Sequence, residues 1–550
     1  MGHPVTRIGD PEVYLARRVL DALLREDYGG LRRHIYRNAS RSNGHICRDT
    51  SRHSCRHISG ADVAPATLRL PGGRAVRLAR DGFLADYRVA DDVGLDEVLG
   101  ALRHLADPAD DVAAFARECR EALATLHLHA AHHAQVVGRL ERSPTYYEVL
   151  GAYVDHPVYP TARCRFGLTE DDLRGYAPEF APVFPLRWAA LPRDRITEAG
   201  NRPEWWPRPA DVGLPATRRV LLPVHPITAR GLNGLDVDLA PEPYLEVTPT
   251  LSMRTVAVDA ATHLKLPLLT STLGLRNRRT IVPGTLHDGA LVQRLLARAS
   301  LRTPVPVVLA DEQTYGHAAD PLLGYLIRRV PPRTAVPVAA LLAVAPGGRY
   351  VIEELTDDIA GFFDAYLRIL FGWHVALFGY GIALEAHQQN ISVMPPDTGP
   401  EPLALPELPE LLVKDNDGAL LDPVALARHD LGPVEVVDRR MLTADREALA
   451  RVFVTITLHL CAGAIAFGLA ERGLLSLRAG LGLVRARLDQ ALDEHGQTFL
   501  RSRTLDADRL PTKAMITAGT LVDKARTGAL DINKHYGPPG PNYLRDIPCC

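Results

Sequence analysis

The spacing of hydrophobic residues predicts an alternation of helical and strand-rich regions along the chain of 550 residues. Residues 11–35 carry apolar side chains at helical spacing, which predicts one amphipathic helix that ends near Gly29 and Gly30. Residues 67–90 alternate short apolar runs with Gly and Asp and predict two or three strands, whereas residues 94–140 return to the helical period. The N-terminal region is therefore expected to combine helices with a small sheet.

The pattern changes twice more towards the C-terminus. From about residue 150 to 345 the chain is proline-rich and strand-like, and from about 350 it is mainly helical, with a strand pair between helical stretches. These changes predict three domains, at residues 1–150, 151–345 and 346–550. The apolar run at 452–470 approaches the length of a membrane span, but His459 and two threonines within it favour a buried helix.

Residues 36–62 are polar, basic and poor in apolar residues, which predicts a mobile surface loop. The loop also contains three histidines and two cysteines, so a metal site is the alternative, although their spacing matches no common zinc pattern. These residues are His45, Cys47, His53, Cys55 and His57.

Composition narrows the classes of function. Hydrophobic residues make up 46% of the chain and charged residues 23%, which is typical of a globular protein with sizeable cores. The net charge of −2 provides no general basic field, so nucleic acid is not an expected partner. A membrane is not expected either, because the one long apolar run, 452–470, is interpreted as a buried helix. Seven cysteines without a regular framework and an N-terminus without an apolar leader predict a cytoplasmic protein. Only five of the 63 basic residues are lysine, so each lysine departs from the local preference for arginine.

The common motifs for nucleotide binding and hydrolysis are absent from the sequence. It contains no Gly-Lys dipeptide and therefore no Walker A loop, and no GxGxxG opens a helix after a predicted strand. A GxSxG elbow and an HExxH helix are also missing. An enzyme of this sequence that uses ATP would have to bind the phosphates with side chains.

A first candidate constellation is the segment EVTPTLSMRTV at 246–256. If this segment is one strand, a single face carries the side chains of Thr248, Thr250, Ser252 and Arg254. Hydroxyl groups beside a guanidinium suit phosphate oxygens, and the alternative is a solvated sheet face. A hairpin with the next segment, 262–281, would bring Lys265 beside Ser252 and Arg254. Further cations follow, so the hairpin could form an anion pocket or a surface arginine cluster: Arg276, Arg278 and Arg279.

A second constellation lies in GYGIALEAHQQNISV at 379–393. Strand alternation would place Glu385, His387 and Gln389 on one face, with Asn390 at the strand end. These groups are costly to bury unless they bind something, and the alternative is a satisfied structural network. The acidic turn after LLV at 411–413 supplies two aspartates, and Asp415 or Asp417 could complete a Mg²⁺ site with Glu385 or instead belong to an ordinary hairpin.

Five segments resemble, in the same order, the IucA/IucC family, the NRPS-independent siderophore synthetases. They are DHPVYPTARCRFG…YAPEF, the VHP step, SMRT, HLKLP followed by arginine, and EAHQQN with a later K-D-x-D-G turn. The resemblance extends from about residue 145 to 520, and LPTKAMITAGTL at 510–521 looks like the family's C-terminal helical segment. Asp155, Tyr159 and Arg163 stand where the family usually has glycine, a second histidine and lysine.

The resemblance implies an α+β fold shaped like a cupped hand. Residues 1–150 would form a thumb of helices and a small sheet, and residues 151–345 would form fingers built on an antiparallel, ATP-binding sheet. Residues 346–550 would form a mainly helical palm with a strand pair. The family often forms dimers, so a homodimer is also expected.

The resemblance also implies the chemistry. A carboxylate, most often of citrate, attacks the α-phosphate of ATP and gives an acyl-adenylate plus pyrophosphate. An amine or hydroxyl of a polyamine, amino acid or amino alcohol then displaces AMP and forms an amide or ester. Two other functions are a degenerate relative that only binds nucleotide and carboxylate, and a kinase-like phosphotransferase.

The matching positions assign provisional roles to individual residues. ATP would be bound by Ser252, Arg254, Thr255, Lys265, His387, Gln389 and Asp415. The acid would be bound by His156, Arg163, Arg276 and His387, although the choice among the arginines at 276–279 stays open. Catalysis would depend on Lys265, Arg276 and His387, and Mg²⁺ would be held by Glu385, Asn390 and Asp415.

Overall fold

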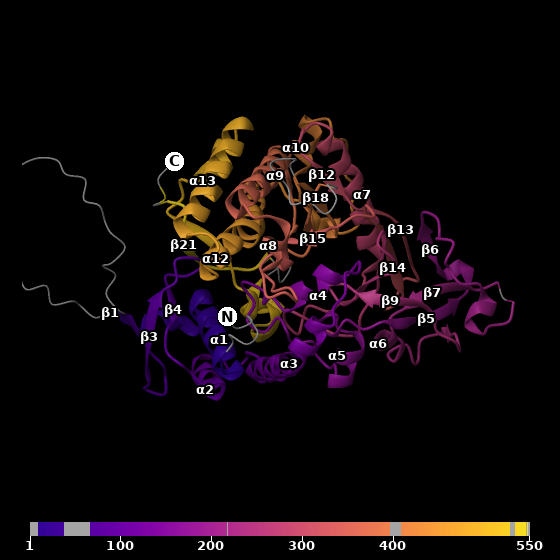
Figure 1. Ribbon diagram of the computed structural model, residues 1–550, viewed down its shortest axis with the longest axis horizontal. Coiled ribbons are helices and arrows are strands. Elements are labelled where there is room, and N and C mark those ends of the chain that lie inside the picture. Colours follow the sequence, from indigo (N-terminus) through magenta and orange to yellow (C-terminus); the bar gives the residue numbers. More distant parts are fainter. Residues whose placement is uncertain are drawn as a thin grey trace, which may run out of the picture.

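The computed structural model describes residues 9–37, 66–216, 218–396, 409–528, 534–545 and 547. Nearly all of the segment expected to be a mobile loop, 36–62, lies outside these residues, and so does the alternative metal site within it. An N-terminal region with a small sheet, a large antiparallel sheet and a mainly helical C-terminal region lie around a common centre (Figure 1). The expected α+β class is therefore confirmed.

The N-terminal region packs helices against a four-stranded antiparallel sheet of order β1-β2-β3-β4, which confirms the strands expected before residue 90. Its first helix ends at Glu26, not near Gly29, because Asp27 adopts a left-handed conformation (φ 50°) and its N–H closes the last turn onto the carbonyls of Leu23 and Leu24. The elements are α1 (Pro11–Glu26), β1 (Ile35–Arg37), β2 (Ala66–Arg69), β3 (Ala75–Arg80), β4 (Tyr87–Val89), α2 (Leu95–Leu105) and α3 (Val112–Gly138).

A nine-stranded antiparallel sheet forms the middle of the chain, with the order β6-β13-β14-β11-β10-β9-β5-β7 and β8 paired to β5. Both faces are covered, because the adjacent residues Trp188 and Ala189 of β5 pack into two different apolar clusters. The strands are β5 (Phe184–Leu191), β6 (Thr197–Ala199), β7 (Val220–Val224), β8 (Asp238–Leu239), β9 (Tyr244–Pro249), β10 (Thr255–Ala257), β11 (Thr262–Lys265), β13 (Asp311–His317) and β14 (Gly324–Arg329). Four helices accompany it: α4 (Tyr146–Ala152), α5 (Glu170–Tyr176), α6 (Pro226–Ala229) and α7 (Pro283–Ser300).

A second sheet of order β12-β18-β17-β15 joins the middle of the chain to its C-terminal part. β12 (Val307–Leu309) runs parallel to β18 (Glu410–Val413), and β15 (Val336–Pro337) pairs with β17 (Ile391–Met394). The predicted boundary at residue 345 therefore does not coincide with a division between the sheets.

The C-terminal region is mainly helical, and α9 and α13 pack side by side (Figure 1). Its helices are α8 (Val351–Leu355), α9 (Ile359–Gly379), α10 (Pro423–Arg428), α11 (Arg446–Val452), α12 (Ala464–Glu471), α13 (Leu477–Glu494), α14 (Thr498–Arg503) and α15 (Lys524–Thr527). Two strand pairs complete it: β16 (Ile382–Ala383) with β19 (Leu420–Leu421), and β20 (Arg509–Lys513) with β21 (Tyr536–Pro541).

Two C-terminal predictions can be compared with these elements. Among the described residues, one helix, Arg446–Glu471, is long and apolar enough to cross a membrane, but 89% of its apolar window is buried inside the molecule. This burial agrees with the core helix expected at 452–470. The segment 510–521 is not one helix, because residues to Lys513 pair with β21 and a π-helical turn follows only at Thr517–Leu521.

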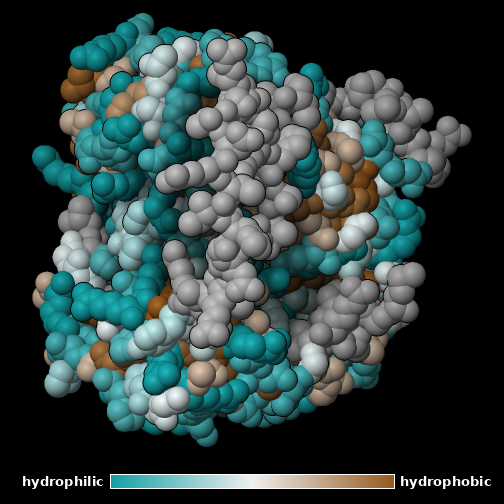
Figure 2. Space-filling view, turned by 90° about the vertical axis from the view of Figure 1, so that its left-hand side faces the viewer, coloured by the Kyte–Doolittle hydropathy of each residue, from teal (hydrophilic) through white to brown (hydrophobic). Residues whose placement is uncertain are grey.

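The molecular face over the N-terminal sheet and α13 is largely hydrophilic, with separate small hydrophobic areas (Figure 2).

Candidate functional site

A cavity of about 280 Å³ is lined by segments that are far apart in the sequence. Seven of its lining residues are Arg or Lys and four are Asp or Glu, so positive charge is in excess. Most of the predicted site residues line it: His156, Arg163, Ser252, Arg254, Thr255, Glu385, His387, Gln389, Asn390 and Asp415. Lys265 and Arg276 are not among its lining residues.

Ser252 and Arg254 reach the cavity from a tight turn between β9 and β10. The N–H and the hydroxyl of Thr250 both donate to the carbonyl of Thr255 (2.9 and 2.8 Å), and the Ser252 hydroxyl accepts the N–H of Thr255 (3.1 Å). The prediction that 246–256 is one continuous strand is therefore wrong. Short hydroxyl side chains here bond to the backbone and close a turn.

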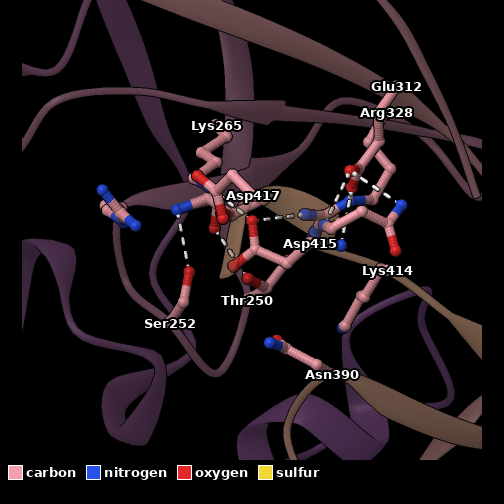
Figure 3. Close-up of polar contacts among 12 residues, drawn as sticks. Thr250, Ser252, Lys265, Glu312, Arg328, Asn390, Lys414, Asp415 and Asp417 are labelled. Carbon is pink, nitrogen blue, oxygen red and sulfur yellow. Dashed lines mark hydrogen bonds and ion pairs between the residues drawn. The ribbon is translucent and has the colours of Figure 1, made fainter. Parts of the chain in front are cut away.

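The predicted hairpin between β10 and β11 is confirmed, and Thr255 lies opposite Lys265. Lys265 is only 3% exposed. Its ammonium forms ion pairs with Asp415 and with Asp417, the latter at 3.2 Å (Figure 3). Lys265 therefore lies directly behind the cavity wall, and its ion-pair partner Asp415 is the residue that faces the cavity.

Asp415 is held by residues of the large sheet (Figure 3). Glu312 on β13 accepts the N–H of Asp415 (2.9 Å) and the Nε–H of Arg328 on β14 (2.5 Å). The Arg328 guanidinium lies 3.4 Å from the Asp415 carboxylate. Burial would raise the pKa of Asp415, but Lys265 and Arg328 outweigh it and hold the pKa well below its usual range. The Asp415 carboxylate is therefore ionised at neutral pH.

A buried ion pair fixes two cavity segments relative to each other. Glu148 on α4 binds the ammonium of Lys414 at 3.2 Å and accepts the N–H of Leu251 at 2.9 Å. Burial would raise the pKa of Glu148, but Lys414 and the Leu251 N–H lower it below its usual value. The pair thus ties the β9–β10 turn to the end of β18. No periodic pattern in the sequence pointed to Glu148 as a site residue.

The segment with Glu385, His387 and Gln389 is a turn between β16 and β17, so the predicted strand alternation there is wrong. The N–H of His387 donates to the Glu385 carbonyl (2.9 Å), and the N–H of Asn390 donates to the His387 carbonyl (2.8 Å). These bonds fold the segment onto itself, because a strand would use the same groups for pairing. The turn nevertheless presents all four side chains to the cavity.

The ring orientations of His156 and His387 determine which nitrogen can meet a ligand. The N–H of Gln389 donates to Nδ1 of His387 (3.3 Å), and the N–H groups of Val158 and Tyr159 donate to Nδ1 of His156 (3.1 and 3.0 Å). A main-chain N–H can only donate, so the ring proton of each neutral imidazole is on Nε2. Burial lowers the pKa of His387 to about 4 and that of His156 to about 3. Both rings are therefore neutral hydrogen-bond donors at neutral pH.

Arg163 is engaged by the protein on all sides of its guanidinium. It donates to the Asp155 carboxylate, to Nδ1 of His129 and to the carbonyl of Tyr153, each at 2.7 Å. These bonds hold the loop that carries His156. A substrate carboxylate would have to compete with Asp155 for Arg163, so the predicted contact with the acid is not favoured by this arrangement.

Arg279, and not Arg276, lines the cavity. The main-chain N–H of Arg276 donates to the Gly519 carbonyl (3.1 Å), which directs this residue to the C-terminal segment. Arg279 donates to the Thr272 hydroxyl. Burial lowers the pKa of Arg279 to about 9, and the neighbouring Arg254 adds to the effect. Within the described residues neither Arg254, which donates to the Thr280 carbonyl, nor Arg279 forms an ion pair with a carboxylate, so both charges are available to an anion. Arg276 is also in no such ion pair, and its buried Nη1 has no hydrogen-bond partner there.

Glu385, Asn390 and Asp415 line the same cavity and offer the oxygen donors that suit Mg²⁺. In the described ranges, no group of three or more His, Cys, Asp and Glu side chains is arranged to hold a metal by itself. The set therefore suits an ion that is shared with the oxygens of a bound phosphate, which is the usual situation for Mg²⁺.

The sequence patterns did not point to several residues that line the cavity, among them Arg328 and Lys513. Lys513 ends β20, lines the cavity, and helps to lower the pKa of both His156 and His387, for which burial is the main cause. The feature of the sequence that could have pointed to Lys513 was the scarcity of lysine in the chain. Three of the chain's five lysines, at 265, 414 and 513, lie at this cavity or directly behind it.

Comparisons with known proteins find similarity in two parts of the chain. The model of the IucA/IucC family matches residues 143–343, and a model described as ferric iron reductase FhuF-like transporter matches residues 360–528. The rhizobactin siderophore biosynthesis protein RhbC of Rhizobium meliloti is 28% identical over 307 residues, which are 44% of this chain and 50% of RhbC. The matches thus span about half the length of the curated relatives.

Solved structures extend the similarity to nearly the whole chain. ATP-bound aerobactin synthetase IucA from Klebsiella pneumoniae has a TM-score of 0.69 at 18% identity, and covers 97% of this chain and 99% of that one. The petrobactin biosynthesis protein AsbB from Bacillus anthracis has a TM-score of 0.71 at 14% identity, and covers 98% and 96%. The fold is therefore that of these synthetases, and residues 143–343 are similar to the IucA/IucC family.

Proposed function

We propose that this protein is an ATP-dependent siderophore synthetase that joins a polycarboxylic acid, citrate or a related acid, to an amine or hydroxyl. The carboxylate attacks the α-phosphate of ATP, and an acyl-adenylate and pyrophosphate form. The nucleophile then attacks the acyl carbon, and AMP leaves as the amide or ester bond forms. The similarity of residues 143–343 to the IucA/IucC family, and of the chain to the siderophore biosynthesis protein RhbC, supports a role in siderophore biosynthesis.

The observation that carries the proposal is the positive charge of the cavity. A triphosphate and a polycarboxylate repel each other, so an enzyme that joins them must neutralise both. Arg254 and Arg279 lie in the cavity without a carboxylate partner among the described residues, and Lys265 lies behind Asp415. The relative IucA was solved with ATP bound, which supports ATP as the nucleotide.

The side chains divide between the two anions in this proposal. The β9–β10 turn would bind phosphate oxygens through Ser252, Arg254 and Thr255. Arg279 and the Nε2–H groups of His156 and His387 would hold the acid and the charge that develops on it. Both histidines are donors with Nδ1 already bonded, so neither is assigned as the base that takes the proton of the nucleophile.

Glu385, Asn390 and Asp415 would hold Mg²⁺, which supplies charge neutralisation at the phosphates when bound. The ionised state of Asp415 favours this assignment. Lys265 and Arg328 keep Asp415 ionised and in place in the absence of a metal.

We also propose that the three predicted regions, 1–150, 151–345 and 346–550, act as thumb, fingers and palm around this cavity. Support comes from the lining residues: Leu84 belongs to the first region, the segment from Gly151 to Arg165 and the turn between β9 and β10 belong to the second, and the turns after β16 and β18 belong to the third. A homodimer remains part of the proposal as a family property.

The test is a reaction of purified protein with ATP, Mg²⁺, citrate and a panel of amines, followed by measurement of pyrophosphate and of the nucleotide product. The proposal expects pyrophosphate and AMP, and both should depend on the acid. ADP as the product would indicate a phosphotransferase instead. Thermal stabilisation by ATP without any turnover would indicate a protein that only binds its ligands.

A further inference from the structure

An irregular helix forms part of the cavity wall. The segment Phe453–Gly463, between α11 and α12, is π-helical, so its N–H groups donate five residues back instead of four. This pattern is rare, occurs mostly as single turns and is frequent at functional sites, whereas here it extends over 11 residues. Four residues of the segment line the cavity: Thr455, Ile456, His459 and Leu460. The irregular helix is therefore adjacent to the proposed substrates.

The return from the π-helical to the α-helical pattern leaves one main-chain carbonyl without a donor in its own helix. The last π-helical bond runs from the N–H of Ala464 to the carbonyl of His459. In α12 each N–H again donates four residues back, so the N–H of Ile465 is directed to Cys461 and the carbonyl of Leu460 is passed over. Leu460 is buried, and a buried carbonyl without a partner is costly. Its carbonyl therefore needs a donor from outside the helix.

Gln388 supplies that donor from the turn that carries His387. Its side-chain Nε2 donates to the Leu460 carbonyl at 2.5 Å. The carbonyl of Ala386, in the same turn, accepts the thiol of Cys461 at 3.3 Å. Ala386 and Gln388 are the two chain neighbours of His387, so the π-helical segment holds the turn on both sides of this histidine.

The same segment also holds β20. Nε2 of His459 lies 3.0 Å from the Pro511 carbonyl, and its Nδ1 lies 3.0 Å from the Tyr543 hydroxyl. A carbonyl can only accept, so the ring proton is on Nε2 and Nδ1 accepts the O–H of Tyr543. Pro511 lies two residues before Lys513, which lines the cavity. The π-helical segment thus connects two cavity segments, the turn with His387 and the strand with Lys513.

We infer that the segment Phe453–Gly463 is a positioning element of the enzyme, and that Gln388 is a positioning residue that acts through His387. A regular α-helix would bond the Leu460 carbonyl to its own N–H and would offer the turn no anchor at this place. The inference rests on the proposed function, because it concerns the donor that would hold the acid and its developing charge. A misplacement of such a donor by about 1 Å can lower the rate about 10²-fold.

The test is a double-mutant cycle, measured as acid-dependent exchange of pyrophosphate into ATP. Gln388→Met keeps the length of the side chain and removes its donor, so the variant should fold. It should lower the maximal rate by about tenfold to 100-fold and leave KM for ATP and for the acid within about threefold of wild type. In a His387→Ala background the same substitution should lower the rate by less than about threefold, because the residue that Gln388 positions is no longer there.

Gln490→Met is the matched control, since Gln490 is exposed on α13, bonds to Glu494 and does not line the cavity. This variant should exchange at the wild-type rate. If Gln388→Met raises KM with an unchanged maximal rate, Gln388 contacts a ligand directly. If it slows His387→Ala as much as it slows the wild type, Gln388 does not act through His387. Either result overturns the inference and leaves the proposed function standing, because the wild-type protein still carries out the exchange.

Crystal structures of the wild type and of Gln388→Met test the geometry without any reaction. The turn should move away from Leu460 in the variant and displace Nε2 of His387 by about 1 Å or more. A His387 ring that stays in its wild-type place would overturn the inference alone. Absence of exchange by the wild-type protein with every acid tested would overturn the proposed function and, with it, the role inferred for Gln388.

Discussion

Replacing Arg279 by alanine should slow the reaction strongly and leave the fold intact. Arg279 makes one side-chain bond, to Thr272, and it lies beside a second cation, Arg254. Burial and that neighbour lower the pKa of Arg279 to about 9, which means that its charge is held at a cost in the free protein. Removal of the charge should therefore change the free energy of unfolding by no more than about 1 kcal/mol.

The loss in activity can be estimated from the bonds that Arg279 would make to an anion. A hydrogen bond to a charged group contributes about 1.5–3 kcal/mol. Since 1.4 kcal/mol corresponds to a factor of ten, binding of the anion should weaken by about 10- to 150-fold. If the same donor also stabilises charge in the transition state, kcat should fall by about 10²–10³. Arg279→Lys should fall between wild type and alanine, because it keeps the charge and loses the planar fork.

The assay is acid-dependent pyrophosphate release at varied citrate and varied ATP, with circular dichroism and thermal melting to check the fold. Arg276→Ala is the control, because Arg276 does not line the cavity and should stay within about threefold of wild type. The reverse order of effects, with Arg276→Ala inactive and Arg279→Ala close to wild type, would refute the placement of the anion site at Arg279.

Three further predictions concern residues around the same cavity. His387→Gln keeps an N–H donor and should retain more activity than His387→Ala. Because burial lowers the pKa of His387 to about 4, the pH dependence of the rate should show no loss of activity near the ordinary histidine pKa. Such a loss in the wild type, absent from both variants, would contradict the role of His387 as a neutral donor. Lys265→Ala should lose most pyrophosphate release and stay folded, but with a lower melting temperature, because Asp415 loses a buried counter-charge. A wild-type rate would remove Lys265 from the site. Glu148→Gln leaves Lys414 buried without its counter-charge and should cost about 3–5 kcal/mol in urea unfolding. Since the pKa of Glu148 is lower in the folded state, its contribution is present above the unfolded value of about 4.3 and is lost as the pH falls below it, so the two stability curves should converge in acid.

The hairpin of β10 and β11 could be predicted from the sequence because local information determines it. His263 and Lys265 alternate with apolar Leu264 and Leu266, and the short turn that precedes them fixes which residues can face each other. The observed register, with Thr255 opposite Lys265, follows from that alternation. The helix at 452–470 could be predicted for a similar reason, since an apolar run of that length with few charges must be buried.

The two polar turns could not be predicted from the sequence, because polar side chains at every second position are compatible with a turn of this kind as well as with a strand. At 250–254 the hydroxyls of Thr250 and Ser252 bond to the backbone, and Met253 takes a left-handed conformation (φ 63°) that no glycine announces. Hydroxyl side chains can bond to the backbone in place of strand pairing, and residues distant in the sequence decide which of the two forms. Glu148 is such a residue, because its carboxylate accepts the N–H of Leu251.

The choice between Arg276 and Arg279 depended on contacts of the same long-range kind. Main-chain bonds between Arg279 and both Leu268 and Thr270 close the loop next to β11, and this places Arg279 at the cavity. The tip of the loop packs instead against the C-terminal segment, where Gly274 (φ 110°) approaches Gly519 so closely that a Cβ atom would lie 2.6 Å from it. From their spacing along the chain, Arg276 and Arg279 are equally good candidates for binding an anion. The contact between Gly274 and Gly519 forms only in the folded chain. It holds the tip of the loop against the C-terminal segment, and of the two arginines Arg279 lines the cavity.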